Sequence, residues 1–122
     1  MKRTMILGAF VLAASLTAPL AAYAECNYPK APASMPDGKS ATEQEMISAM
    51  TAFKQYNSDV NTYLTCLDQE TTARLQDGSI PAEQAMQFKA LQTRKHNSVV
   101  DELQAKADQF NEQVRAFKAR NG

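Results

Sequence analysis

Residues 42–67, TEQEMISAMTAFKQYNSDVNTYLTCL, carry the packing pattern around which this chain is built. Its mostly apolar seam residues recur at alternating steps of four and three, a spacing that predicts a helix with one packing face. The seam positions are Met46, Met50, Phe53, Asn57, Val60, Leu64 and Leu67. The same stretch carries Cys66, so we expect this helix to be both the main packing surface and an anchor for the residues before it.

The predicted first helix has clear start and stop signals. Thr42 is an N-cap residue, and Glu45 stands three residues later as its capping-box partner. Gly78 ends the apolar pattern, so we expect a helix over residues 42–76. Two successive β-branched threonines follow Glu70 and favour a helix poorly, which leaves its continuity past that point open.

A second helix is predicted over residues 81–119. Pro81 suits a first helical position, and no proline or glycine follows until Gly122. Its expected stripe contains Phe88, Leu91, Val99, Leu103, Ala107, Phe110, Val114 and Phe117, with Lys95 interrupting it. The steps of four between several of these depart from a strict heptad, so we expect a nearly straight pair and no sustained coiled coil. The short connection over residues 78–80 makes the two helices antiparallel neighbours, and the fold class is all-α, a long helical hairpin.

Residues 25–41 are predicted to form an extended, proline-rich arm. Pro29, Pro32 and Pro36 exclude a helix there. The sixteen residues from Cys26 to Thr42 reach up to ~50 Å when extended, whereas Cys66 lies ~36 Å along the helix from Thr42. The arm can therefore run antiparallel to the first helix. We expect a disulfide between Cys26 and Cys66 to fasten it there.

Residues 1–24 carry the features of a secretory signal peptide. Lys2 and Arg3 precede an apolar run, and Ala22-Tyr23-Ala24 gives the small-residue pattern of a cleavage site. We therefore expect a periplasmic or secreted protein of one domain, residues 25–122, with no stable membrane anchor after cleavage. That part has 11 basic and 13 acidic residues, a net charge of about −2, which speaks against nucleic-acid binding.

No catalytic or cofactor constellation is predicted. His96 is the only histidine, and a lone histidine in a polar stretch is typical of a surface residue. Zinc needs about four ligands at characteristic spacing, which two distant cysteines and one histidine do not provide. We expect no metal, no cofactor and no enzymatic activity. The methionines at positions 35, 46, 50 and 86 suit core packing better than a soft-metal site.

Ile47, Tyr56 and Tyr63 lie on the flank of the first helix's seam. One interpretation is that they cover the edge of the seam and meet the docked arm. The other is an exposed interaction surface, because a two-helix hairpin struggles to bury both flanks. The same reasoning leaves two assemblies open, a weak homodimer with four helices or a monomer whose arm covers the open flank.

Several short motifs resemble those of a family of small exported proteobacterial proteins of uncharacterised activity. They are Cys26-x-x-Pro29-x-x-Pro32, Met35-Pro36-Asp37-Gly38, Ala41-Thr42 before Glu45-Met46, and Tyr63-Leu64 before Cys66-Leu67. The resemblance covers residues 26–67 and leaves out the second helix. It implies a periplasmic or secreted helical protein and brings no activity or site residues with it.

These patterns favour a non-enzymatic exported protein that acts as an interaction or envelope-associated module. The alternative is a periplasmic helical chaperone or stress protein that holds unfolded clients. A third hypothesis, a metal-handling protein, rests only on the methionines.

Overall fold

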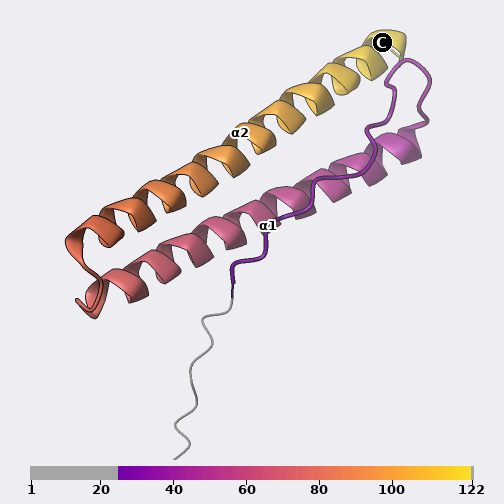
Figure 1. Cartoon of the computed structure of the whole chain (residues 1–122). Helices are drawn as coiled ribbons and strands as arrows, with labels where there is room; N and C mark the ends of the chain where they lie inside the picture. The colour runs from indigo at the N-terminus through magenta and orange to yellow at the C-terminus, as the bar shows by residue number, and fades with distance from the viewer. Residues whose placement is uncertain (1–24, 122) are drawn as a thin grey trace, which may run out of the picture.

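The computed structural model describes residues 25–121, and residues 1–24, with the predicted signal peptide, lie outside this part. It contains two long helices, α1 (Glu43–Gln76) and α2 (Ala82–Asn121). They run antiparallel and side by side, joined by a short connection at one end (Figure 1). The all-α helical hairpin predicted from the sequence is confirmed.

The start of α1 follows from its capping box. The Thr42 hydroxyl accepts the Glu45 N–H at 3.2 Å, and the Glu45 carboxylate accepts the Thr42 N–H at 2.7 Å. These two hydrogen bonds satisfy two backbone donors that the first turn of a helix leaves free. The helix is continuous past Glu70 to Gln76. Gly78 follows with a φ of 65°, the left-handed conformation that ends many helices.

The second helix begins one residue later than predicted and runs two residues further. Pro81 precedes its first residue, and the Pro81 carbonyl accepts the N–H of Ala85 at 3.0 Å. Between the helices, Asp77 accepts the N–H of Ser79 at 2.8 Å. This local hydrogen bond turns the chain back, so that the connection stays short.

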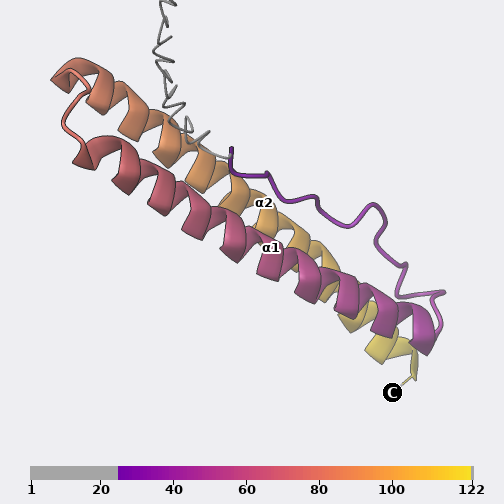
Figure 2. The ribbon, with the colours of Figure 1, turned by 90° about the horizontal axis from the view of Figure 1, so that it is seen from below.

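The arm lies along one side of the hairpin and returns toward the beginning of α1 (Figures 1 and 2). Cys26 is disulfide-bonded to Cys66, with 5.7 Å between their Cα atoms, so the predicted covalent attachment to α1 is confirmed. In the part of the chain that the structure describes, residues 26–36 make no backbone–backbone hydrogen bond. The arm is therefore a third layer that no backbone ladder joins to the helices; the disulfide and contacts that involve at least one side chain hold it.

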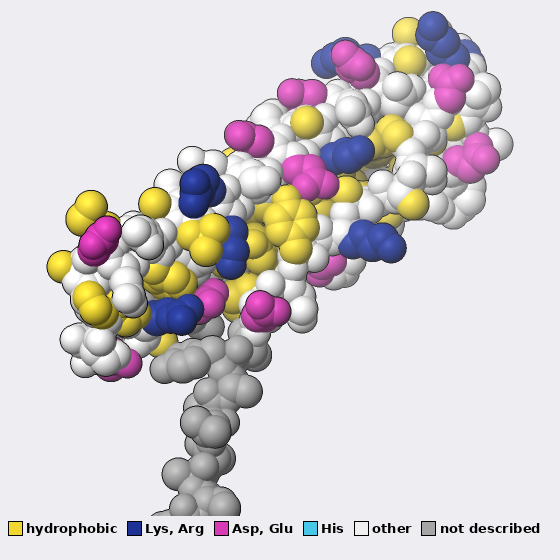
Figure 3. All heavy atoms as spheres, in the orientation of Figure 1, with side chains coloured by type: hydrophobic (Ala, Val, Ile, Leu, Met, Phe, Trp, Pro, Cys, Tyr) yellow, Lys and Arg dark blue, Asp and Glu magenta, His cyan; other side chains and the backbone are white. Residues whose placement is uncertain are grey.

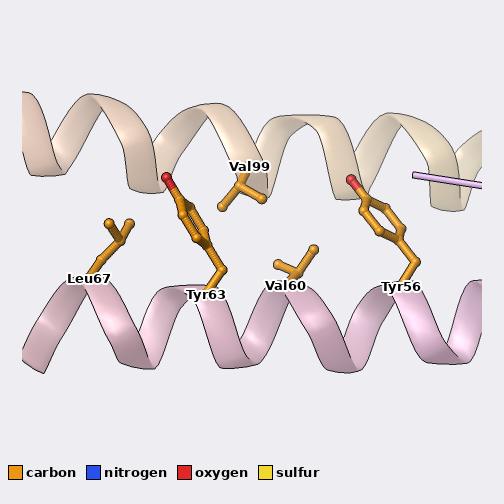
Figure 4. Packing of buried hydrophobic residues seen from close by; sticks show 5 residues of the cluster. All are labelled: Tyr56, Val60, Tyr63, Leu67 and Val99. Atoms are coloured by element: carbon orange, nitrogen blue, oxygen red, sulfur yellow. The ribbon is translucent and has the colours of Figure 1, made fainter. Parts of the chain in front are cut away.

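The core lies between the two helices and beneath the arm. One cluster of buried side chains occupies its middle: Tyr56, Val60, Tyr63, Leu67 and Val99. Figure 4 shows the two tyrosines projecting from α1 toward α2, with Val99 pointing back between them. A second cluster, nearer the N-terminus of α1, contains Ala41, Met46 and Phe110. The rings of Phe53 and Phe110 stack between the clusters at a centroid distance of 5.6 Å.

The predicted seam of α1 is wrong at two positions. Met50 and Asn57 are exposed, whereas Tyr56, at 1% exposure, and Tyr63 are buried. The arm docks beside the tyrosines, so α1 turns this flank inward. Large aromatic side chains also bury more apolar area than Met or Asn.

The predicted stripe of α2 is wrong at Leu91, which is 42% exposed, while its neighbour Gln92 is 5% exposed. The Gln92 amide donates to the Glu70 carboxylate at 3.1 Å and to the Thr71 hydroxyl at 3.3 Å. These partners offset part of the cost of burying an amide, which is why a polar residue can hold a seam position.

Candidate interaction surface

The N-terminal end of the arm, around Cys26 and Tyr28, contacts both helices. Beside the disulfide between Cys26 and Cys66, the Tyr28 ring meets the Tyr63 ring edge-on, with 5.2 Å between centroids. Aromatic pairs favour this arrangement. The Tyr28 hydroxyl donates to the Glu102 carboxylate of α2 at 2.7 Å. The arm thus closes one flank of the groove between α1 and α2.

The C-terminal end of the arm, which leads into α1, contacts the C-terminal part of α2. The Gly38 N–H donates to the side-chain oxygen of Gln113 at 2.9 Å. A Cβ on Gly38 would lie 2.0 Å from the backbone oxygen of Gln113, so only glycine allows this close approach. The Arg120 guanidinium donates to the carbonyl oxygens of Lys39 and Ala41. These contacts fix the loop that leads into α1.

The tyrosines beneath and within the arm stay protonated at neutral pH. Burial and the hydrogen bond to Glu102 raise the pKa of Tyr28. Burial, with a smaller contribution from the Glu102 charge, raises the pKa of Tyr56. Burial and the nearby Glu70 raise the pKa of Tyr63. Neutral phenols suit a packed interface, whereas phenolates would add buried charge.

The interaction surface predicted at Ile47, Tyr56 and Tyr63 is corrected by these positions. Ile47 is exposed, but the two tyrosines belong to the core, so the three residues do not form one exposed patch. The contact between Tyr28 and Tyr63 agrees with the other interpretation, in which the flank of the seam meets the arm.

The face of the hairpin away from the arm is only partly apolar, and we call it the open face. On α1 it follows one row at steps of four and three residues, and on α2 a second row runs beside it. The α1 row is Met50, Lys54, Asn57, Asn61, Leu64 and Asp68. The α2 row is His96, Val100, Leu103, Ala107 and Val114. Met50 and Val100 are exposed.

Helix geometry places the open face opposite the arm. Ser48, Ala49 and Ala52 line a hollow of about 600 Å³ between α1 and the arm. Met50 lies two residues from both Ser48 and Ala52, or about 200° around a helix with 100° per residue. Asp68 and His96 line a separate hollow on the other side of the helix pair. Figure 2 shows the arm on one side of the hairpin only.

The arm-covered face carries both acidic and basic side chains. Figure 3 shows apolar side chains along its middle, with acidic and basic groups interspersed. The hollow beside the disulfide is lined by Glu25 and Glu70 and also by Arg94 and Lys95. Two carboxylates and two cations cancel there, so this hollow has no preference for an anionic or a cationic ligand.

His96 and the methionines at positions 35, 46, 50 and 86 differ in burial. His96 is exposed on the open face. Met46 is buried and Met35 packs beside it, whereas Met50 and Met86 are exposed, the latter at 71%. Within residues 25–121, no group of three or more His, Cys, Asp or Glu side chains is placed to hold a metal ion.

Sequence reasoning missed three side chains that hold the arm, namely Glu102, Gln113 and Arg120. All three come from polar positions of α2, which the apolar stripe of that helix does not include. The steps from Glu102 to Gln113 and on to Arg120, eleven and seven residues, keep them on one helix face. This shared face was the one sequence signal for a polar contact site on α2. The sequence did not indicate that the arm would be the partner of that face.

Comparisons with models of protein families, with curated proteins and with solved structures gave no match for this chain. The resemblance to small exported proteobacterial proteins therefore stays a prediction. Neither α1 nor α2 contains a stretch long and apolar enough to cross a membrane.

Proposed function

We propose that this chain is a non-enzymatic exported protein that works by binding other proteins through the open face of its hairpin. The difference between the two faces carries the proposal. The arm covers one flank of the core, while the opposite flank leaves Met50 and Val100 exposed, in the same two rows as the half-buried Leu64 and Leu103. Apolar side chains gathered on one face of a small protein are typical of interaction sites.

Export is supported by the disulfide between Cys26 and Cys66, because such bonds persist in oxidising compartments. The non-enzymatic part rests on the sequence, where His96 is the only histidine and stands in a polar stretch, as surface histidines commonly do.

Site-specific photocrosslinking in the envelope of the producing cell tests this function. A crosslinker at Met50 should capture a protein, and one at Gln55, an exposed position of α1 outside the open face, should not. Val100→Glu should abolish the capture, because a carboxylate would be desolvated in an apolar contact. Asn97→Glu adds the same charge on the exposed outer side of α2 and should leave it unchanged. Equal capture at both crosslinker positions would contradict the proposal.

A second candidate function, a holdase for unfolded clients, is favoured by the exposed Met50 and Met86. Methionine side chains are flexible and adapt to varied apolar partners. In this case the chain should slow the aggregation of a reduced model client, and the double change Met50→Glu and Met86→Glu should remove that effect. A chain that leaves aggregation unchanged at several-fold molar excess would exclude this function.

A further inference from the structure

We propose that the open face binds a second copy of this chain, so that two hairpins form a four-helix dimer with their arms on the outside. This inference rests on the proposed function and names the partner. It follows from the pattern of charge and polarity along the open face, which is complementary to itself.

Contacts across the core show which residues of α1 and α2 lie at the same height along the hairpin. Phe53 of α1 stacks on Phe110 of α2, and the Gln92 amide reaches the Leu67 carbonyl oxygen at 3.5 Å. Asn61 lies between these two levels on α1. It is therefore level with Val99 and Val100 on α2, in agreement with the place of Val60 and Val99 in the same central cluster.

A two-fold axis in the plane of the interface, perpendicular to the helices and passing Asn61, would place α1 antiparallel to α1 of the second copy. Positions at equal distances from Asn61 then meet. Lys54 lies seven residues before Asn61 and Asp68 seven residues after it. Each Lys54 would face Asp68 of the second copy, which gives two pairs of opposite charge in one interface.

The same axis brings like residues together at its centre. The two Asn61 side chains meet each other, and an amide can both donate and accept in such a pair. An asparagine at the centre of a helical interface is known to fix register. On α2, the two Val100 side chains face each other near the axis, so the apolar side chains lie at its centre and the charged pairs lie toward the ends. An apolar centre with a polar rim is the usual anatomy of a protein interface.

Sedimentation velocity of the exported chain, purified with its disulfide intact, measures the assembly. We expect a monomer and a dimer whose proportions change with concentration from about 1 μM to about 1 mM, the range of a weak interface. Lys54→Asp alone and Asp68→Lys alone should each raise the dissociation constant roughly tenfold, since two charge pairs become repulsive. The double variant restores opposite charges and should restore the wild-type constant.

Crosslinking tests the position of the axis. Asn61→Cys should form an interchain disulfide that mass spectrometry maps to position 61 in both chains, whereas the exposed Gln55→Cys should not. A strict monomer at the highest concentration overturns the second copy as partner. A dimer that fails to link through position 61, or a double charge variant that stays weak, overturns this geometry.

The outcomes also separate this inference from the proposed function. A monomer whose Val100→Glu variant loses an envelope partner overturns the dimer and leaves protein binding intact. A dimer that links through position 61 supports the inference, even if crosslinkers at Met50 capture no other protein and the broader binding function fails.

Discussion

The part of the hairpin beneath the arm and the end that the arm does not reach are built from the same two helices, yet they pack differently. We call residues 72–91 the bare end. No residue of the bare end is fully buried, whereas the covered part contains both core clusters. Phe88 of the bare end is only half-buried beneath the Arg74 guanidinium, while Phe110 of the covered part is buried.

This difference shows what a third layer does for a helical hairpin. Two helices share one interface, and every side chain in it has an open flank on each side of the pair. The arm closes one of these flanks along α1 from Cys66 to Thr42, and that is where side chains become fully buried. A small domain gains much of its stability from such additional coverage.

The largest expected effect comes from detaching the arm, which should make the covered part resemble the bare end. Reduction, or Cys66→Ser, opens a loop with a sequence separation of 40 residues. It should lower the free energy of unfolding by ~4 kcal/mol in the chain-entropy model. Hydrogen exchange should then show residues 46–67 losing protection while residues 72–76 change little. Unchanged protection in residues 46–67 would mean that the arm does not maintain the core.

A matched pair of phenylalanine substitutions compares the two regions directly. Phe110→Ala removes a buried ring that stacks on Phe53 and should cost ~3 kcal/mol. Phe88→Ala should cost only ~1 kcal/mol, because the ring is half-buried and lies beneath Arg74. Urea denaturation of both variants measures the difference. Equal costs would show that the bare end is as well packed as the covered part.

The arm and the bare end each have a glycine, and the two glycines are needed for different reasons. Gly38→Ala should cost ~2 kcal/mol, because its Cβ would clash with the backbone of Gln113. Gly78→Ala should cost ~1 kcal/mol, because alanine is strained at a φ of 65° although the space around it is open. Asparagine tolerates that conformation, so Gly78→Asn should recover stability whereas Gly38→Asn should not. Thermal melting of the four variants checks this.

High pH should weaken the covered part before the bare end. Folding raises the pKa of Tyr28, Tyr56 and Tyr63 above the ordinary value of 10.0, chiefly through burial. Their contribution is therefore fully present below pH 10 and is lost as the pH rises through the folded-state pKa values. Stability should stay flat up to about pH 10 and then fall. Tyr28→Phe should reduce this fall, and a fall that begins below pH 9 would contradict the assignment.

The smallest effect is expected on the acid side. Hydrogen bonds from the Thr42 N–H and hydroxyl lower the pKa of Glu45, and those from Ser79 lower the pKa of Asp77. The stability from these carboxylates is present above their unfolded-state pKa values and is lost as the pH falls through the lower folded-state values. Glu45→Gln should reduce the acid-induced loss, measured by circular dichroism between pH 5 and pH 2. No change would show that the capping box contributes nothing there.

Local chemistry made several features predictable from the sequence. Thr42 and Glu45 cap α1 because the hydroxyl and carboxylate reach only the nearest backbone donors. Gly78 ends the same helix because it adopts positive φ without a Cβ penalty. The pairing of Cys26 with Cys66 could be predicted because the chain offers no other cysteine, and the short connection made the helices neighbours.

The tertiary structure decided which side of each seam is buried. A seam with steps of three and four residues can include either Met50 and Asn57 or Tyr56 and Tyr63. These two seams differ by a fraction of a turn around α1, and periodicity alone does not show which of them faces the core. The docked arm selects the tyrosine side, because it covers that flank and leaves the other to solvent.

Long-range partners were likewise beyond the sequence. Nothing local to Gly38 indicates that it lies against Gln113, which is 75 residues away. Arg120 suits the C-terminus of any helix, and its bonds to the carbonyls of Lys39 and Ala41 exist only because the arm returns to that end of the hairpin. Propensity and capping act over a few residues, whereas burial and close approach depend on which segments the fold brings together.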